Sequence, residues 1–170
     1  PKLFPFVYHR LELHNPFGFP MMPGPIALYR NGTFTGRTST KLRAPNEPVK
    51  LSLGVDNQVQ VHRWVKEEKR YEPGVLSSTQ RLVHRYEIQV GNWTKRRRKV
   101  LILENVPVAQ VKELEVKLGK KTTKLTRYNK EDGIISWELN LAPGAKKTIV
   151  LEYTVHVPKD YLVRGYVTAK

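Results

Sequence analysis

Residues 82–90 decide the fold, because their sequence, Leu-Val-His-Arg-Tyr-Glu-Ile-Gln-Val, alternates along the chain. One face of an extended chain carries Leu82, His84, Tyr86, Ile88 and Val90, and the other carries Arg85, Glu87 and Gln89. A period of two is typical of a β-strand with one buried face. The stretch therefore predicts a strand whose first face lies in a core.

The same alternation recurs in three later segments, 114–118, 135–141 and 149–157. In the second of these, Trp137 lies among Leu and Ile, which indicates core packing. Residues 99–103 are apolar on both faces and predict a more central strand. Helix is scarce, and residues 64–72 fit a charged helical turn, a polar linker or the end of a strand.

Turn signals separate these segments. Asn31-Gly32 predicts a two-residue hairpin between 26–30 and 33–35, because both turn positions need positive φ. Asp132-Gly133 and Pro143-Gly144 predict further turns. The proline-rich stretch 15–25 excludes helix and predicts a rigid, partly buried connection anchored by Phe17 and Phe19.

The predicted fold is all-β, an immunoglobulin-like antiparallel β-sandwich of two packed β units. Pro73-Gly74 suggests a boundary, with an N-terminal β unit over 1–74, including the Pro/Gly-rich connection, and a C-terminal immunoglobulin-like sandwich over 75–170. Residues 44–55 can be aligned with residues 142–153. The prolines then match, and the inward-facing positions of the strand after each proline coincide. Both halves are therefore expected to build the same kind of object.

Composition excludes several classes of protein. The 170 residues include 30 Lys and Arg, 15 Asp and Glu and no cysteine, which gives a net charge of +15. Disulfides and cysteine-based zinc sites are excluded, and the apolar runs are too short to cross a bilayer. Because the chain starts at Pro1, we expect a processed or excised piece of a longer protein, and both the cell envelope and the cytoplasm remain compatible locations.

Two clusters of positive charge stand out, at 95–99 and, more loosely, at 117–130. Such clusters attract polyanions such as nucleic acid, anionic lipid or acidic polysaccharide. Trp93 could stack a base or a sugar ring, or it could cap the end of the sandwich. The alternative for the cations is that they fill solvated turns and strand faces. The candidate polyanion-binding residues are Trp93, Lys95, Arg96, Arg97, Arg98, Lys99, Lys120, Lys121 and Lys124.

Motifs for catalysis are lacking in the sequence. There is no phosphate-binding glycine loop, no nucleophile elbow and no His-Glu-x-x-His pair, and the three aspartates fit turns. His84 is best explained as a core histidine bonded to backbone, because no second ligand is spaced to converge with it. We expect no catalytic residues, no metal site and no cofactor, and thus a protein that is not an enzyme.

A series of landmarks runs along most of the chain. They include Asn15-Pro16-Phe17, Gly36-Arg37-Thr38, Leu53-Gly54-Val55-Asp56 and Ala142-Pro143-Gly144. Over roughly residues 3 to 162 the sequence resembles the C-terminal part of the uncharacterised C-terminal domain of mucoidy-inhibitor-A-like proteins. The resemblance implies an all-β domain, preceded in that family by an N-terminal β domain and a coiled coil, and it implies no activity, cofactor or catalytic residue.

Two hypotheses for function follow. The first is a non-enzymatic binding or structural module whose basic surface contacts another protein or an acidic polymer, with no direct membrane span. The alternative is sequence-independent binding of nucleic acid by the same clusters. A hydrolase would need a pocket that joins His84 or His9 to a carboxylate.

Overall fold

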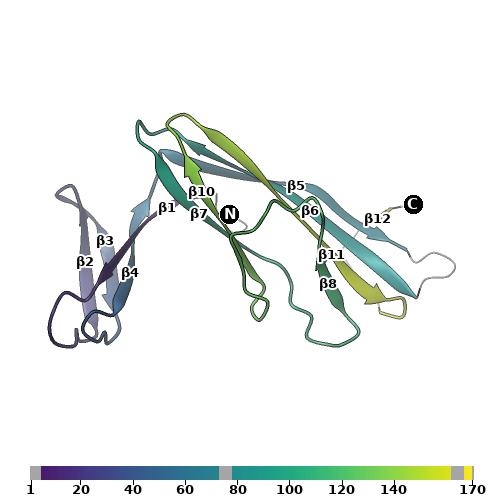
Figure 1. Cartoon of the computed structure of the whole chain (residues 1–170), viewed down its shortest axis with the longest axis horizontal. Helices are drawn as coiled ribbons and strands as arrows, with labels where there is room; N and C mark the ends of the chain where they lie inside the picture. The colour runs from purple at the N-terminus through teal and green to yellow at the C-terminus, as the bar shows by residue number, and fades with distance from the viewer. Residues whose placement is uncertain (1–4, 73–77, 162–166, 170) are drawn as a thin grey trace. The chain divides into compact units, whose positions relative to one another are not determined.

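The computed structural model describes residues 5–72, 78–161 and 167–169 (Figure 1). Over these residues the chain forms strands and no helix, which confirms the all-β prediction. The strands are β1 (Tyr8–His14), β2 (Gly24–Arg30), β3 (Thr33–Thr40), β4 (Pro48–Val55), β5 (Val59–Tyr71), β6 (Thr79–Asn92), β7 (Arg98–Asn105), β8 (Glu115–Leu118), β9 (Arg127–Tyr128), β10 (Ile134–Leu141), β11 (Lys146–Pro158) and β12 (Val167–Ala169).

The chain divides into two compact units: a small unit, Phe6–Asn57, and a large unit, Gln58–Lys170 together with Pro1–Pro5. The sequence suggested a boundary near residue 74, in a segment, 73–77, that lies outside the described residues. The strand before that segment, β5, pairs with β6 along most of its length. Residues 59–71 therefore belong to the main sheet of the large unit, and 64–72 is not a helical turn.

The small unit contains two antiparallel pairs, β1 with β4 and β2 with β3. Asn31 and Gly32 have φ of 50° and 79°, so the predicted hairpin is confirmed. Inside the unit, Leu28 and Val49 are buried. Asp56, expected at a turn, is buried and its Oδ2 lies 3.1 Å from His9 Nε2.

The prediction that Phe17 and Phe19 anchor the proline-rich connection is wrong. Their side chains are 49% and 62% exposed, and their rings stack on each other with centroids 5.2 Å apart. The anchor is Asn15, which is buried and donates from Nδ2 to the carbonyl oxygens of Phe19, Arg43 and Ala44. A chain that turns this sharply leaves carbonyl groups without strand partners, and the amide satisfies them.

The large unit is a sandwich of two sheets. The five-stranded sheet has the order β12-β5-β6-β11-β8, the three-stranded sheet has the order β7-β10-β9, and the pairings are antiparallel except for β12 with β5. The predicted inward faces of 82–90 and 135–141 are buried. Across the core, Trp137 Nε1 on β10 donates to the carbonyl oxygen of Thr123, whose own N–H bonds to the edge of β11.

The expectation that residues 99–103 form a more central strand is also wrong. They belong to β7, which lies at one edge of the three-stranded sheet with β10 in the middle. Its second apolar face carries Leu101 and Leu103, which are 41% and 51% exposed. Apolar side chains on the surface are common, so a doubly apolar strand need not be buried on both faces.

Both units contain the same corner. Like Asn15, Asn92 is buried and donates from Nδ2 to three carbonyl oxygens, one of them four residues ahead, on Arg96. The other two belong to Leu141 and Ala142, which lead into a Pro-led turn just as Arg43 and Ala44 do. In each case Oδ1 accepts the backbone N–H two residues ahead.

The strands around the two corners also correspond. Asn46 and Gly144 occupy the same place in the Pro-led turns and have φ of 61° and 71°. Around them, β1, β2, β3 and β4 match β6, β7, β10 and β11 in order and in pairing. The similarity of 44–55 to 142–153 is therefore a repeat of structure, with β8 and β9 added between β7 and β10 in the large unit.

Two glycines of the large unit provide a matched test of this packing. Gly133 and Gly144 both have φ of 71°, but a Cβ at Gly133 would lie 2.2 Å from the carbonyl oxygen of Val106, whereas a Cβ at Gly144 would meet nothing within 4 Å. We expect Gly144→Ala to cost about 1 kcal/mol of unfolding free energy through backbone strain. Gly133→Ala should lower the unfolding free energy by about 1–3 kcal/mol more, because the backbone at Val106 must move to make room for the new Cβ. Urea unfolding of both variants measures the difference, and equal losses would contradict the packing of Val106 on Gly133.

Candidate polyanion-binding surface

The turn between β6 and β7 carries the first basic cluster and is held by Asn92. Besides its three bonds to carbonyl oxygens, Asn92 accepts the N–H of Thr94 at Oδ1, 3.0 Å away. Thr94 is buried too, and its Oγ1 lies 2.7 Å from both Asn92 Oδ1 and the carbonyl oxygen of Arg96. The backbone of the turn is thereby fixed from inside, and its large side chains face outward.

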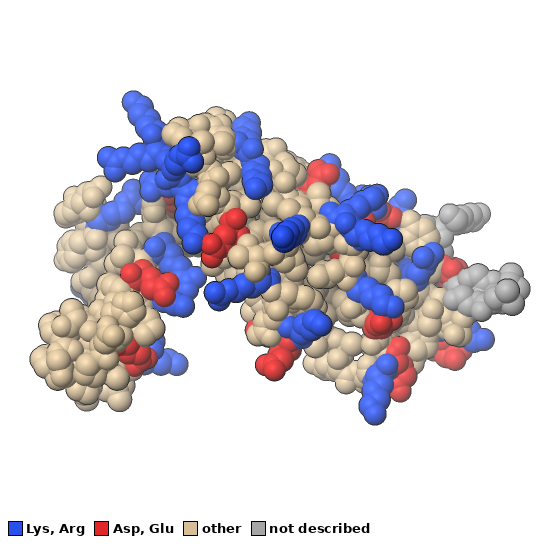
Figure 2. Space-filling view, in the orientation of Figure 1, with Lys and Arg blue, Asp and Glu red and all other residues tan. Residues whose placement is uncertain are grey.

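The outward side chains are the predicted ones. Trp93 is 51% exposed, and Lys95, Arg96 and Arg97 are exposed. The start of β11 adds a cation, since Nζ of Lys146 lies 4.9 Å from the centroid of the Trp93 ring. Figure 2 shows Lys and Arg side chains gathered over the end of the large unit where this turn and the start of β11 lie. Trp93 is thus not buried as a cap, although its indole lies close to the backbone of Gly91.

Arg98 and Lys99 belong to the strand rather than to the turn. Both lie in β7, where Arg98 is partly buried and Nζ of Lys99 lies 2.7 Å from Oε2 of Glu138 on β10. The hydrogen bond from Lys99 holds the pKa of the Glu138 carboxyl below its ordinary value. The five consecutive cations of the sequence therefore divide into three on the turn and two that serve the sheet.

The second cluster lies elsewhere on the large unit. Lys120, Lys121 and Lys124 are exposed on the segment that follows β8. Gly119 donates its N–H to the carbonyl oxygen of Glu152, 2.7 Å away, and Thr123 donates to that of Val150. The structure thus places this cluster along the edge of β11, whereas Lys146, at the start of β11, lies beside the first cluster.

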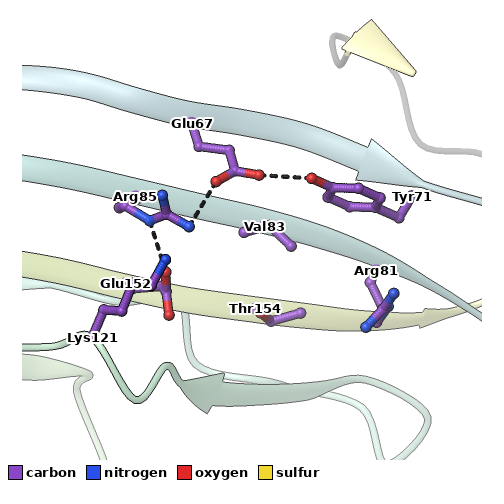
Figure 3. Close-up of a pocket in the computed structure, with 8 residues that line it drawn as sticks. All are labelled: Glu67, Tyr71, Arg81, Val83, Arg85, Lys121, Glu152 and Thr154. Carbon is purple, nitrogen blue, oxygen red and sulfur yellow. Dashed lines mark hydrogen bonds and ion pairs between the residues drawn. The ribbon is translucent and has the colours of Figure 1, made fainter. Parts of the chain in front are cut away.

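A shallow hollow of about 320 Å³ lies next to Lys121, on the outer face of the five-stranded sheet (Figure 3). At its centre, Arg85 bridges two carboxylates, with Nη2 2.9 Å from Glu67 Oε2 and Nε 2.7 Å from Glu152 Oε2. Tyr71 donates its hydroxyl to Glu67, 2.7 Å away, which raises the pKa of that hydroxyl. The bond with Glu152 raises the pKa of Arg85.

Sequence reasoning missed this hollow. The pattern of 82–90 placed Arg85 on the outer face, but Glu67 and Glu152 lie on two other strands far away in the sequence. Only the register of β5 and β11 on β6 brings them together. Alternation along one strand carries no information about that register.

His84 is buried on the inner face, as predicted. Its Nδ1 lies 3.1 Å from the Tyr86 hydroxyl, and its ring stacks on Tyr153 with centroids 4.6 Å apart. Burial, and then the hydrogen bond to Glu68, raise the pKa of Tyr86 well above its usual range. Over the described part of the chain, no group of three His, Cys, Asp or Glu residues could hold a metal ion.

These features define a β-sandwich protein with a rigid, cation-bearing turn at one end of its larger unit. The chain belongs to the family of the domain of unknown function DUF4139, whose model matches residues 22–159. Searches of curated proteins and of solved structures found no match. Within the described residues, no helix has the length and hydropathy needed to cross a membrane.

The role of Asn92 in holding the turn can be tested directly. Asn92→Asp replaces a donor with an acceptor that faces three carbonyl oxygens, so we expect a loss of about 3 kcal/mol or more of unfolding free energy. Asn105→Asp, an exposed position at the end of β7, should change it by about 0.5 kcal/mol or less. Denaturant unfolding measures both, and equal stabilities would show that Asn92 does not hold the turn.

Proposed function

We propose that this protein is a non-enzymatic binding or structural module that contacts an acidic polymer, or an acidic surface of another protein, through the β6–β7 turn. The observation that carries the proposal is the burial of Asn92 beneath exposed Trp93, Lys95, Arg96 and Arg97. A fixed turn loses less conformational entropy on binding than a flexible basic tail does. Because the buried Asn92 side chain holds the turn from inside, the exposed cations remain available to bind a partner.

Several contacts support a module without catalysis. The candidate acid or base groups are engaged in packing: His84 stacks on Tyr153, and Arg85 bridges Glu67 and Glu152. An arginine that bridges two carboxylates holds all three groups in a structural role.

We also propose that the chain is the C-terminal part of a mucoidy-inhibitor-A-like protein. The resemblance in the Asn-Pro-Phe segment at 15–17, in Gly36-Arg37-Thr38 and in Leu53-Gly54-Val55-Asp56 supports this assignment. The last two of these segments lie within the range that the family model matches.

The binding proposal is tested by the salt dependence of binding to heparin. A variant with Lys95→Gln, Arg96→Gln and Arg97→Gln should bind more weakly. Its slope of log K against log[salt] should be shallower by roughly 3, because each cation that contacts the polymer releases about one counterion. Fluorescence titration between about 0.05 and 0.2 M salt measures that slope.

The matched control neutralises Arg30, Arg37 and Lys41, three exposed cations of the small unit. It has the same net charge as the turn variant and should keep the slope of the wild type. If both variants lose affinity equally, attraction is generic and the turn is not the site. Tighter binding of single-stranded DNA than of heparin, lost in the turn variant, would favour the nucleic-acid alternative.

A further inference from the structure

We infer that the outer face of β5, β6 and β11 is a platform for a linear acidic polysaccharide. This inference rests on the proposed function and deepens it, since Trp93 and Lys146 belong to both surfaces. It selects one class of acidic polymer, and it adds Trp64 and His62 as contact residues that the sequence did not single out.

The register of the sheet places the platform on one face. Gln60, His62 and Trp64 of β5 pair with Gly91, Gln89 and Glu87 of β6, and these in turn pair with Lys146, Thr148 and Val150 of β11. On β6 these positions alternate with the buried side chains Tyr86, Ile88 and Val90. All of them therefore lie on the face that points away from the core.

Aromatic rings run along this face from its cationic end. Trp93 and His62 line a small hollow of about 60 Å³ together with Gln60, Gln89 and Lys146. The rings of His62 and Trp64 follow, with centroids 5.8 Å apart and planes 24° from parallel. Trp93 and Trp64 are 51% and 43% exposed. A row of exposed rings on one face of a sheet suits a ligand made of repeated apolar ring faces, which pyranose rings supply.

Hydrogen-bonding groups on the same face distinguish a sugar polymer from a nucleic acid. Glu87 lies between Trp64 and Val150 in the register, with its Oε2 3.0 Å from Nζ of Lys66, and Glu67 and Glu152 follow further along. Carboxylates accept hydrogen bonds. Sugar hydroxyls can donate such bonds, whereas a phosphodiester backbone has no donor. Each of these carboxylates has a cation beside it, Lys66 or Arg85, and an ion-paired carboxylate can still accept a hydrogen bond from a hydroxyl.

Cations along the same face favour a polymer that also carries acid groups. Lys146 lies at one end of the track, and Arg81 and Lys121 line the larger hollow toward the other end, where Figure 3 shows Arg85 already bridging Glu67 and Glu152. A chain of uronic acids offers hydroxyls to the carboxylates, ring faces to the indoles and carboxylates to the lysines. Polygalacturonate is therefore the probe of choice.

The test compares Trp64→Ala with wild type for binding of polygalacturonate oligomers, followed by calorimetry and by tryptophan fluorescence. Trp64 lies outside the β6–β7 turn, so its loss should leave the binding of inorganic polyphosphate, which has charge but no ring faces, unchanged while it weakens polygalacturonate about tenfold. Trp64→Phe should restore most of the affinity. Tyr128→Ala removes an exposed ring from the other sheet and should have no effect.

The outcomes separate this inference from the function on which it rests. Tenfold weaker polygalacturonate binding by Trp64→Ala, with polyphosphate binding unaffected, supports the platform. If heparin binding depends on the turn but Trp64→Ala does not change polygalacturonate binding, the platform is rejected and the proposal for the β6–β7 turn is kept. If oligo(dT) binds more tightly than polygalacturonate and depends on Trp64, the polysaccharide assignment is overturned in favour of nucleic acid. If no polymer binds, the platform fails, and so does the proposal that the turn binds an acidic polymer.

Discussion

The architecture depends on one interaction: a buried asparagine amide that donates to three backbone carbonyl oxygens where a strand leaves one sheet for another. Asn15 does this in the small unit and Asn92 in the large unit. A chain that changes sheets must break its ladder of hydrogen bonds, and an unsatisfied buried carbonyl is costly. One asparagine amide donates to these carbonyl groups, so the residues that follow it can point outward. In the large unit those residues are Trp93 and the cations of the turn.

Ion pairs of the sheets neutralise part of the positive charge. Arg85 bridges Glu67 and Glu152, Arg63 pairs with Glu104, and Lys99 pairs with Glu138. The acidic side chains of the large unit are thus largely engaged where strands meet, and the cations of the turns lie outside this network. The exposed cations of the β6–β7 turn, Lys95, Arg96 and Arg97, are therefore not among those that hold the strands together.

Most of the fold could be predicted from the sequence, because alternation in 82–90 and 135–141 reports burial directly, and Asn31-Gly32 specifies its turn. Three features could not. Apolar residues on both faces of 99–103 do not distinguish an exposed edge from a central strand. Phe17 and Phe19 suggest burial by their size, although Asn15 makes the bonds that hold the segment. The partners of Arg85 depend on the register of three strands, which no single stretch encodes. Of the candidate site, the turn at 93–97 was predictable from its charge. The place of His62 beside Trp93, with Trp64 next to His62, follows only once β5 is paired with β6.

The burial of Asn92 has a practical consequence for producing the protein. Asn92-Trp93-Thr94 fits the acceptor sequence for N-linked glycans, yet the amide nitrogen that would carry the glycan is occupied by three carbonyl groups in the interior. In a secretory eukaryotic host, oligosaccharide transfer to the nascent chain would compete with closure of this corner. A glycan added first would block folding of the large unit, so a host that lacks this modification suits the chain better.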